Sequence, residues 1–262
     1  MSASAGTTHL CAERATPDDA VGSTVSLTRV IVADAVKRSL DHWEAKQWDA
    51  AMQHACNAVD GTGNKRYPQL GVAGRFKHTV RDSLDIFRVM TQPGIDFDQT
   101  RFPVAVKSDL PDGRPDIADV LYAIHRCSRG HTDELPKGFE LTPAGPRPAG
   151  VHIWRTGKIQ LPAAAAIGLL SIAVFAPENK GQDIPDGYTL SWNQHVFQIN
   201  GWWGWQDHFR EIISVVQFPQ NTLDFGASWD EWTPVSAKEP EPTLESSAKH
   251  TRTDSNSEPS DP

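Results

Sequence analysis

The sequence predicts a mainly α-helical fold that is elaborated with two β-hairpins and flanked by disordered termini. Large apolar residues at helical spacing predict the helices, and a change to strict alternation after residue 150 predicts the strands. The chain has 262 residues, enough for one large domain or two small ones. Its hydrophobic fraction of 39% and charged fraction of 22% exclude collagen-like, wholly disordered and disulfide-framework proteins.

Three helical segments are expected in the first half of the chain. Apolar residues recur at helical intervals from Ser26 to Val59 without a proline or glycine, which predicts one long helix or a helical pair. The Asp-Gly-Thr-Gly stretch at 60–63 predicts a turn, and the helical pattern resumes from Arg75 to Met90. Asp116 is placed to cap a third amphipathic helix, for which Gly130 is a plausible end.

The second half of the chain mixes strands and helices. Alternating apolar residues predict one hairpin at Val151–Leu161 and another at Tyr188–Ile199. The apolar run at Leu161–Pro177 is short for a membrane span, so a buried helix through Ala163–Phe175 is expected, with a span as the lesser alternative. A last amphipathic helix is expected over Gln206–Gln217.

Composition divides the chain into five parts. These are a disordered tail at 1–24, a helical core at 25–135, a proline-rich linker at 136–150, an α+β extension at 151–235 that packs on the bundle, and a disordered acidic tail at 236–262. The acidic tail has six acids against three bases, so it carries −3 of the formal net charge of −8. This charge argues against broad coating of nucleic acid or an anionic membrane, but it permits a local basic site.

The cysteines and the N-terminus indicate a cytoplasmic protein. Cys11, Cys56 and Cys127 are scattered and form no C-x-x-C pattern, which favours a reducing compartment. The first residues lack a basic segment followed by an apolar one, so no secretory signal is expected. The negative net charge and the short apolar run leave a membrane partner unexpected as well. Neither a zinc-binding H-E-x-x-H nor a phosphate-binding G-x-x-x-x-G-K-[ST] motif is present, so no metal or cofactor is expected.

The segment DIADVLYAIHRCSRGHTDELP (116–136) carries the most chemical information. It places Arg126 late in the third helix and His131 after four intervening residues, as an R-x4-H pattern. A histidine can move a proton at neutral pH, and an arginine can neutralise a phosphate with planar, paired hydrogen bonds. The pair therefore has the residue types for RNA cleavage without metal. The alternative is a helix-end cation followed by an ordinary loop histidine.

This motif and its placement resemble the HEPN superfamily, over roughly residues 27–135. The resemblance implies a helical bundle that acts as a metal-independent endoribonuclease, often in toxin or defence systems, with Arg126 and His131 as catalytic residues. It also implies a homodimer that pairs its motifs across a twofold axis, an RNA substrate and a cognate antitoxin or regulator. Many members have a polar residue after the motif arginine, where this chain has Cys127. That departure favours the alternative of a non-catalytic, dimeric interaction or nucleic-acid-binding module.

Further bases lie near the motif or in a local basic stretch. Residues 60–88 hold six bases against three acids, a surplus that can guide a phosphate backbone or form a solvated helix face. The residues expected to bind RNA or phosphate are Arg129, His125, Lys65, Arg66 and Arg75. The aromatic segment GWWGWQDHF (201–209) is interpreted as packing, with base stacking as the alternative.

Overall fold

The computed structural model describes residues 32–91, 94–128, 138–145, 150–193, 195–216 and 219–225, without the side chains of 126–128. The predicted tails at 1–24 and 236–262 lie outside these residues. The described helices are α1 (Val32–Glu44), α2 (Trp48–Arg66), α3 (Val72–Arg81), α4 (Leu84–Thr91), α5 (Ile117–Ser128), α6 (Ala165–Phe175) and α7 (Gln206–Ser214). The described strands are β1 (Phe139–Thr142), β2 (His152–Ile153), β3 (Ile159–Pro162), β4 (Thr189–Trp192) and β5 (His195–Gln198). A mainly helical fold with small sheets is confirmed.

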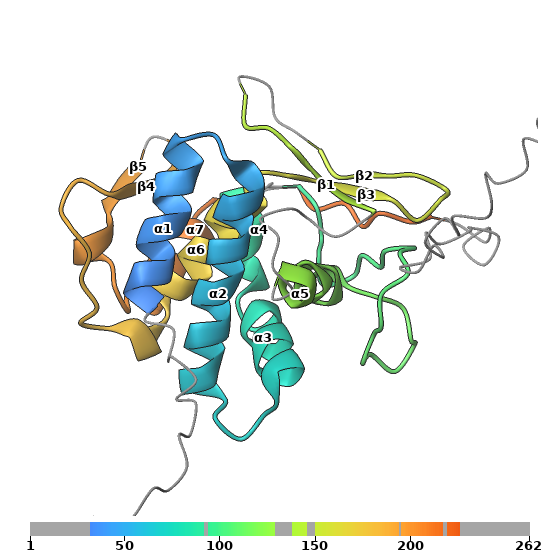
Figure 1. Ribbon diagram of the computed structural model, residues 1–262, viewed down its shortest axis with the longest axis horizontal. Coiled ribbons are helices and arrows are strands. Elements are labelled where there is room, and N and C mark those ends of the chain that lie inside the picture. Colours follow the sequence, from blue (N-terminus) through green and yellow to red (C-terminus); the bar gives the residue numbers. More distant parts are fainter. Residues whose placement is uncertain are drawn as a thin grey trace, which may run out of the picture.

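Helix α6 lies at the centre of the helical layer. It is apolar on every side, and ten of its eleven residues are buried against α1, α2 and α4 (Figure 1). The buried helix expected from the apolar run is confirmed. One continuous hydrophobic cluster joins it to residues from Val32 on α1 to Ile213 on α7, so the second half of the chain shares the core of the first. No described helix combines the length and apolarity needed to cross a membrane.

The predicted turn at 60–63 is wrong, because α2 continues through it to Arg66. The first helical stretch is a pair, α1 and α2, and Gly63 lies inside the second helix. A Cβ on Gly63 would stand 2.7 Å from Thr79 Oγ1 and 2.8 Å from the Arg75 carbonyl oxygen, both on α3. Here glycine serves the close approach of two helices, a role that local sequence does not distinguish from a turn.

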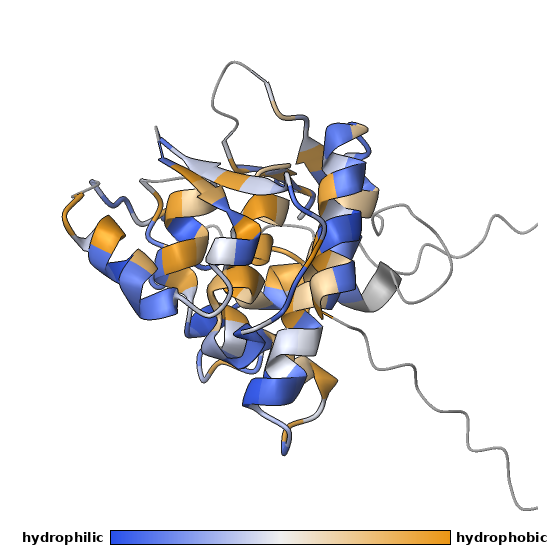
Figure 2. Cartoon of the chain, turned by 90° about the vertical axis from the view of Figure 1, so that its left-hand side faces the viewer, coloured by the Kyte–Doolittle hydropathy of each residue, from blue (hydrophilic) through white to orange (hydrophobic). Residues whose placement is uncertain are grey.

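The helix expected over Arg75–Met90 is divided into α3 and α4 at Asp82–Ser83. The division lets α3 pack on α2 and α5 while α4 packs on α6. A Cβ on Gly168 of α6 would stand 2.8 Å from the Phe87 ring, so α4 also uses a glycine for close packing. The apolar faces of these helices gather toward the inside of the molecule, with hydrophilic residues outside (Figure 2).

Helix α5 begins as its sequence predicts. The Asp116 carboxylate accepts a hydrogen bond of 2.9 Å from the backbone N–H of Asp119. The Asp119 carboxylate in turn accepts one of 3.3 Å from the backbone N–H of Asp116. Two N–H groups that the helix leaves without partners are satisfied in this reciprocal cap.

Both predicted hairpins are present, on opposite sides of the helices (Figure 1). Strands β2 and β3 pair antiparallel with His152 opposite Gln160, and β4 and β5 pair antiparallel with Leu190 opposite Phe197. Strand β1 was not predicted, because it falls within the expected linker. It pairs in parallel with β3, giving the sheet order β1-β3-β2.

The aromatic segment before α7 mostly packs in the core. Trp203 is 3% exposed, and the Trp202 ring meets the Phe197 ring edge-on at 4.7 Å. The Phe209 ring of α7 stacks on Phe175 of α6, with 4.3 Å between centroids. Packing is therefore confirmed for two of the three tryptophans, whereas Trp205 is 52% exposed. Helix α7 is confirmed and ends earlier than predicted, at Ser214.

A Gly63→Ala substitution tests the close contact of α2 with α3. Alanine favours the helix by up to about 1 kcal/mol, but its methyl group requires the two helices to move apart. We expect the free energy of unfolding to fall by about 2 kcal/mol, the typical cost of overpacking. Gly74→Ala is the matched control, because its Cβ meets only Leu70 side-chain atoms, at 3.5 Å or more. Urea denaturation measures both, and equal stabilisation of the two variants would contradict the packing role.

Candidate functional site

The structure places Arg126 in the last turn of α5, where the sequence predicts it. Its side chain is not among those described, and Arg129 and His131 lie outside the described residues altogether. The described structure therefore fixes the backbone position of the motif arginine. The meeting of Arg126 with His131 stays a prediction.

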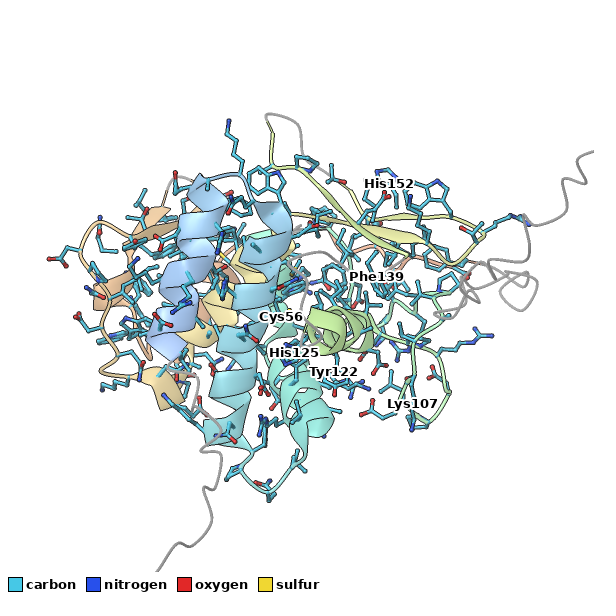
Figure 3. The ribbon with its side chains drawn as sticks, in the orientation of Figure 1. Cys56, Lys107, Tyr122, His125, Phe139 and His152 are labelled. Atoms are coloured by element: carbon cyan, nitrogen blue, oxygen red, sulfur yellow. The ribbon has the colours of Figure 1, made fainter. Side chains whose placement is uncertain are left out.

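His125, the neighbour of Arg126, occupies a different environment from the one expected. Its ring is fully buried and stacks on Phe76 of α3, with 5.0 Å between ring centroids. Figure 3 labels His125 on α5. The His125 Nε2 atom lies 3.8 Å from a carboxylate oxygen of Asp60 on α2. A phosphate cannot reach this ring in the folded chain, so the expected phosphate contact does not fit the position of His125.

Asp60 joins α2, α3 and α5 through its carboxylate. Arg75 of α3 donates two hydrogen bonds to it, of 2.8 and 3.1 Å, and a third of 2.9 Å to Asn64. Burial raises the pKa of Asp60, but hydrogen bonds from His125 and Arg75 outweigh burial and hold it well below its usual range. Arg75 was expected to bind phosphate, and in the structure it neutralises a carboxylate of its own chain.

Lys65 and Arg66, at the end of α2, are similarly occupied. Arg66 forms a two-pronged ion pair with Glu178, with hydrogen bonds of 2.8 and 3.0 Å. Lys65 donates a 2.8 Å hydrogen bond to the side-chain oxygen of Asn179. Both partners belong to the short 3-10 helix Pro177–Asn179 that follows α6. The two bases therefore fasten α2 to the end of the central helix.

A second cluster of charges, which was not predicted from the sequence, lies between α3 and α5. Lys77 and Arg81 on α3 face Asp116 and Asp119 at the start of α5, with Asp109 at the edge. The closest contacts are Lys77 Nζ to Asp119 at 2.6 Å and Arg81 Nε to Asp116 at 2.7 Å. Hydrogen bonding to Arg81 lowers the pKa of Asp109 to about 2. The four-residue spacing of the two bases, like the three-residue spacing of Asp116 and Asp119, was the available signal.

Together these clusters place acids beside bases where α2, α3 and α5 meet. Asp60 and Asp119 are nearly inaccessible to water, and buried charges require such partners. In this region the described bases serve mainly to hold helices together. Lys65, Arg66 and Arg75 therefore each have a partner in their own chain, and phosphate binding by this stretch stays a prediction.

Other classes of site find no support among the described residues. Cys56 is fully buried, and burial raises the pKa of its thiol well above the usual range, so it is not a nucleophile. The described part of the chain holds no group of three His, Cys, Asp or Glu residues placed to bind a metal ion.

Asp60→Asn tests the charge cluster through its pH dependence. The native pKa of Asp60 is depressed, so its contribution is complete above the unfolded value near 4 and is lost as pH falls. Asparagine leaves Arg75 without its counterion, and we expect a loss of about 3 kcal/mol of unfolding free energy at pH 7. The difference in unfolding free energy between wild type and Asp60→Asn should narrow as the pH falls from 5 to 3. Urea denaturation at each pH measures it.

Asp34→Asn provides the control for this experiment. Asp34 pairs with Arg38 on the exposed face of α1, at 2.9 Å, with both side chains more than half exposed. Exposed ion pairs of this kind contribute little to stability, so we expect the unfolding free energy to change by no more than about 0.5 kcal/mol. A difference between wild type and Asp60→Asn that stays constant from pH 5 to pH 3 would contradict the assigned role of the carboxylate.

Comparison with known proteins identifies relatives of this chain. The profile of the family described as Rv1289 matches residues 31–229, a range that contains every described residue. Three proteins described as uncharacterized, Mb1320 of Mycobacterium bovis and MT1327 and Rv1289 of Mycobacterium tuberculosis, are each 59% identical over 207 residues. The alignments cover 79% of this chain and 99% of each relative. No solved structure matches significantly. The chain therefore belongs to the Rv1289 family.

Proposed function

We propose that this protein is a metal-independent endoribonuclease of the HEPN type, with Arg126 and His131 as its catalytic residues. The observation that carries the proposal is the placement of Arg126 in the last turn of the amphipathic helix α5, five residues before His131. The mainly helical core around α5 is compatible with it. A cytoplasmic toxin or defence system, with a cognate antitoxin as regulator, is the setting that the HEPN resemblance implies.

The two side chains divide the reaction between them. His131 removes the proton of the 2′-hydroxyl or returns one to the leaving oxygen. The 2′-oxygen attacks phosphorus while the bond to the 5′-oxygen breaks, leaving a 2′,3′-cyclic phosphate and a 5′-hydroxyl. Arg126 binds the phosphate and neutralises the charge that develops on its oxygens. This reaction changes no oxidation state, so it requires no oxidant or reductant, and the two side chains act without a metal.

The spacing of the motif favours a homodimer. Five residues of an ideal helix turn by about 140° beyond one full rotation, so two side chains at this spacing would not share a face of one continuous helix. They converge if the helix ends between them or if a second copy of the chain supplies one of the pair. A twofold axis near the end of α5 would place two motifs in one groove for RNA.

A second candidate is a non-catalytic, dimeric interaction or nucleic-acid-binding module. The surroundings of the other expected RNA ligands favour it: Lys65, Arg66 and Arg75 hydrogen-bond to groups of their own chain, and His125 is buried. A ribonuclease needs phosphate contacts beyond one arginine to hold its substrate. Cys127, in the position where many HEPN proteins have a polar residue, agrees with this candidate.

Incubation of the purified protein with RNA in the presence of a chelator tests the proposal. We expect cleavage to products ending in a 2′,3′-cyclic phosphate, and a loss of at least about 100-fold in Arg126→Ala and His131→Ala, the range typical of a general acid or base. Arg101→Ala and His208→Ala are matched controls. Arg101, which is partly exposed, pairs with Asp112, and the exposed His208 pairs with Glu211, so both controls should retain wild-type rates.

The mass in solution and the affinity for RNA separate the two candidates. A dimer that binds RNA without cleaving it, and whose Arg126→Ala and His131→Ala variants bind equally well, would replace the ribonuclease with the non-catalytic module. A monomer at high concentration with identical products from wild type and both variants would reject the proposal.

A further inference from the structure

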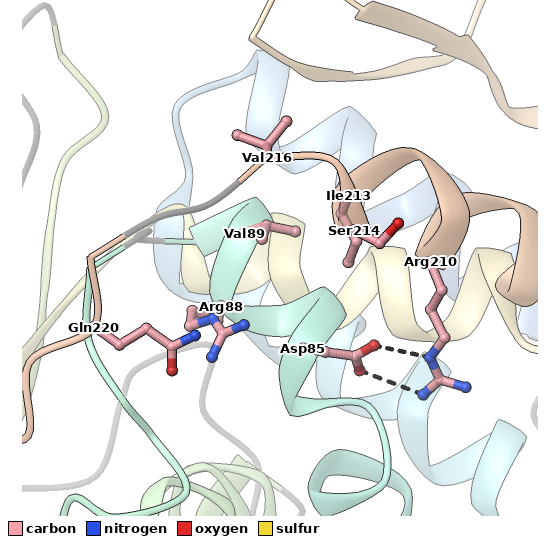
Figure 4. Close-up of a pocket in the computed structure, with 8 residues that line it drawn as sticks. All are labelled: Asp85, Arg88, Val89, Arg210, Ile213, Ser214, Val216 and Gln220. Atoms are coloured by element: carbon pink, nitrogen blue, oxygen red, sulfur yellow. Dashed lines mark hydrogen bonds and ion pairs between the residues drawn. The ribbon is translucent and has the colours of Figure 1, made fainter.

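A pocket of about 550 Å³ lies between α4 and α7, and its described lining contains neither Arg126 nor His131. Figure 4 shows charged side chains on one side of it and aliphatic side chains on the other. Its described lining consists of Asp85, Arg88 and Val89 from α4, Arg210, Ile213 and Ser214 from α7, and Val216 and Gln220 from the segment that follows. This volume lies within the usual range for small-molecule sites.

The two arginines of the pocket differ in their partners. Arg210 is matched, because it donates hydrogen bonds of 2.8 and 3.3 Å to the two carboxylate oxygens of Asp85 and a third, of 2.8 Å, to the Asp82 carbonyl. Arg88 is not matched: its Nε atom is buried and has no hydrogen-bond acceptor within the described residues. Its charge acts on Asp98 at longer range, without an ion pair between them.

A guanidinium that lines a pocket and has no carboxylate partner offers a charge-assisted hydrogen bond to an anionic ligand. Asp85 neutralises one of the two arginines, so the described lining keeps a net charge of +1. A ligand with one negative charge balances this lining, and the fork of Arg88 suits the two oxygens of a carboxylate. A phosphate dianion would leave the pocket with excess negative charge.

The opposite wall specifies the rest of the ligand. Val89, Ile213 and Val216 line it, and Val216 remains 36% exposed at the surface. An apolar ligand body would cover these side chains and remove them from water. The Gln220 amide and the Ser214 hydroxyl add hydrogen-bonding groups at the rim. Ser214 already donates to the Glu211 carbonyl and can still accept a hydrogen bond.

We propose that the α4–α7 pocket binds a small monocarboxylate with an apolar body, and that Arg88 holds its carboxylate group. The proposal is independent of the ribonuclease, since it uses neither Arg126 nor His131. It assigns a ligand to Arg88, which lines the pocket across from aliphatic side chains and whose Nε atom has no acceptor among the described residues.

Isothermal titration calorimetry with the full chain tests this inference with four probes. Hexanoate has the charge and the apolar body, hexanamide lacks the charge, and acetate and inorganic phosphate lack the body. We expect hexanoate to bind at least tenfold more tightly than each of the other three. Equal affinity for hexanoate and hexanamide would overturn the role of the charge. If phosphate binds as tightly as hexanoate or more tightly, the proposed preference for a carboxylate ligand is wrong.

Variants of Arg88 locate the binding and separate it from folding. Arg88→Met keeps the aliphatic stem but removes the guanidinium, so we expect at least a tenfold loss of hexanoate affinity. Its thermal midpoint without ligand should equal or exceed that of wild type, because an unmatched buried donor is removed. Arg88→Lys should bind with intermediate affinity. Arg101→Met, at an arginine paired with Asp112, is the matched control and should bind as wild type does.

Chemical-shift changes on adding hexanoate should concentrate in α4 and α7. Wild-type affinity in Arg88→Met, or shifts confined to other helices, would reject the site. A lower thermal midpoint in Arg88→Met would also count against it, because the arginine would then be stabilising the fold without a ligand. Ribonuclease measurements play no part in this experiment, so its failure is distinguishable from failure of the proposed function.

Discussion

The burial of α6 is the constraint on which the remaining architecture depends. A helix that is apolar on every side must be covered on every side, and α1, α2 and α4 supply most of that cover. Small residues let these neighbours approach closely: the chain has Ala165, Ala166 and Gly168 in the first turns of α6, and Gly168 faces the Phe87 ring of α4. The other described elements are placed around this packed centre, including α7, whose Phe209 ring stacks on the end of α6.

Covering α6 has an electrostatic consequence for the helices around it. Helix α2 must contact α6 on one side and α3 on the other, so Asp60 is drawn into the interior, where a charge is tolerated only with partners. Arg75 and His125 provide them from α3 and α5. The abundance of bases in this stretch therefore reflects the packing of charged helices, and a count of bases along the sequence overstates the surface charge open to a phosphate backbone.

The parts of the fold that depend on local pattern were predictable. The buried helix α6, the Asp116 cap of α5 and both hairpins follow from residue spacing within a few positions. The helical turn at Gly63 and strand β1 were not, because each is decided by a partner distant in sequence: Thr79 beside the glycine and β3 beside the strand. The same limit applies to the sites. A sequence shows which residues carry charge, but the acid that neutralises Arg66 is Glu178, 112 positions away.

The fold thus decides which arginines can bind a ligand, because it determines which of them lie beside a carboxylate. Arg66, Arg75 and Arg210 each form a two-pronged ion pair with a carboxylate, so their charge is neutralised within the fold. Arg88 lies one helical turn from Asp85 on α4, yet that carboxylate is occupied by Arg210 of α7. The docking of α7 on α4 thus engages Asp85 with Arg210, and the same two helices line the pocket that contains Arg88. An unmatched cation and a cavity arise together from a single helix-to-helix contact, which explains why neither is visible in the sequence.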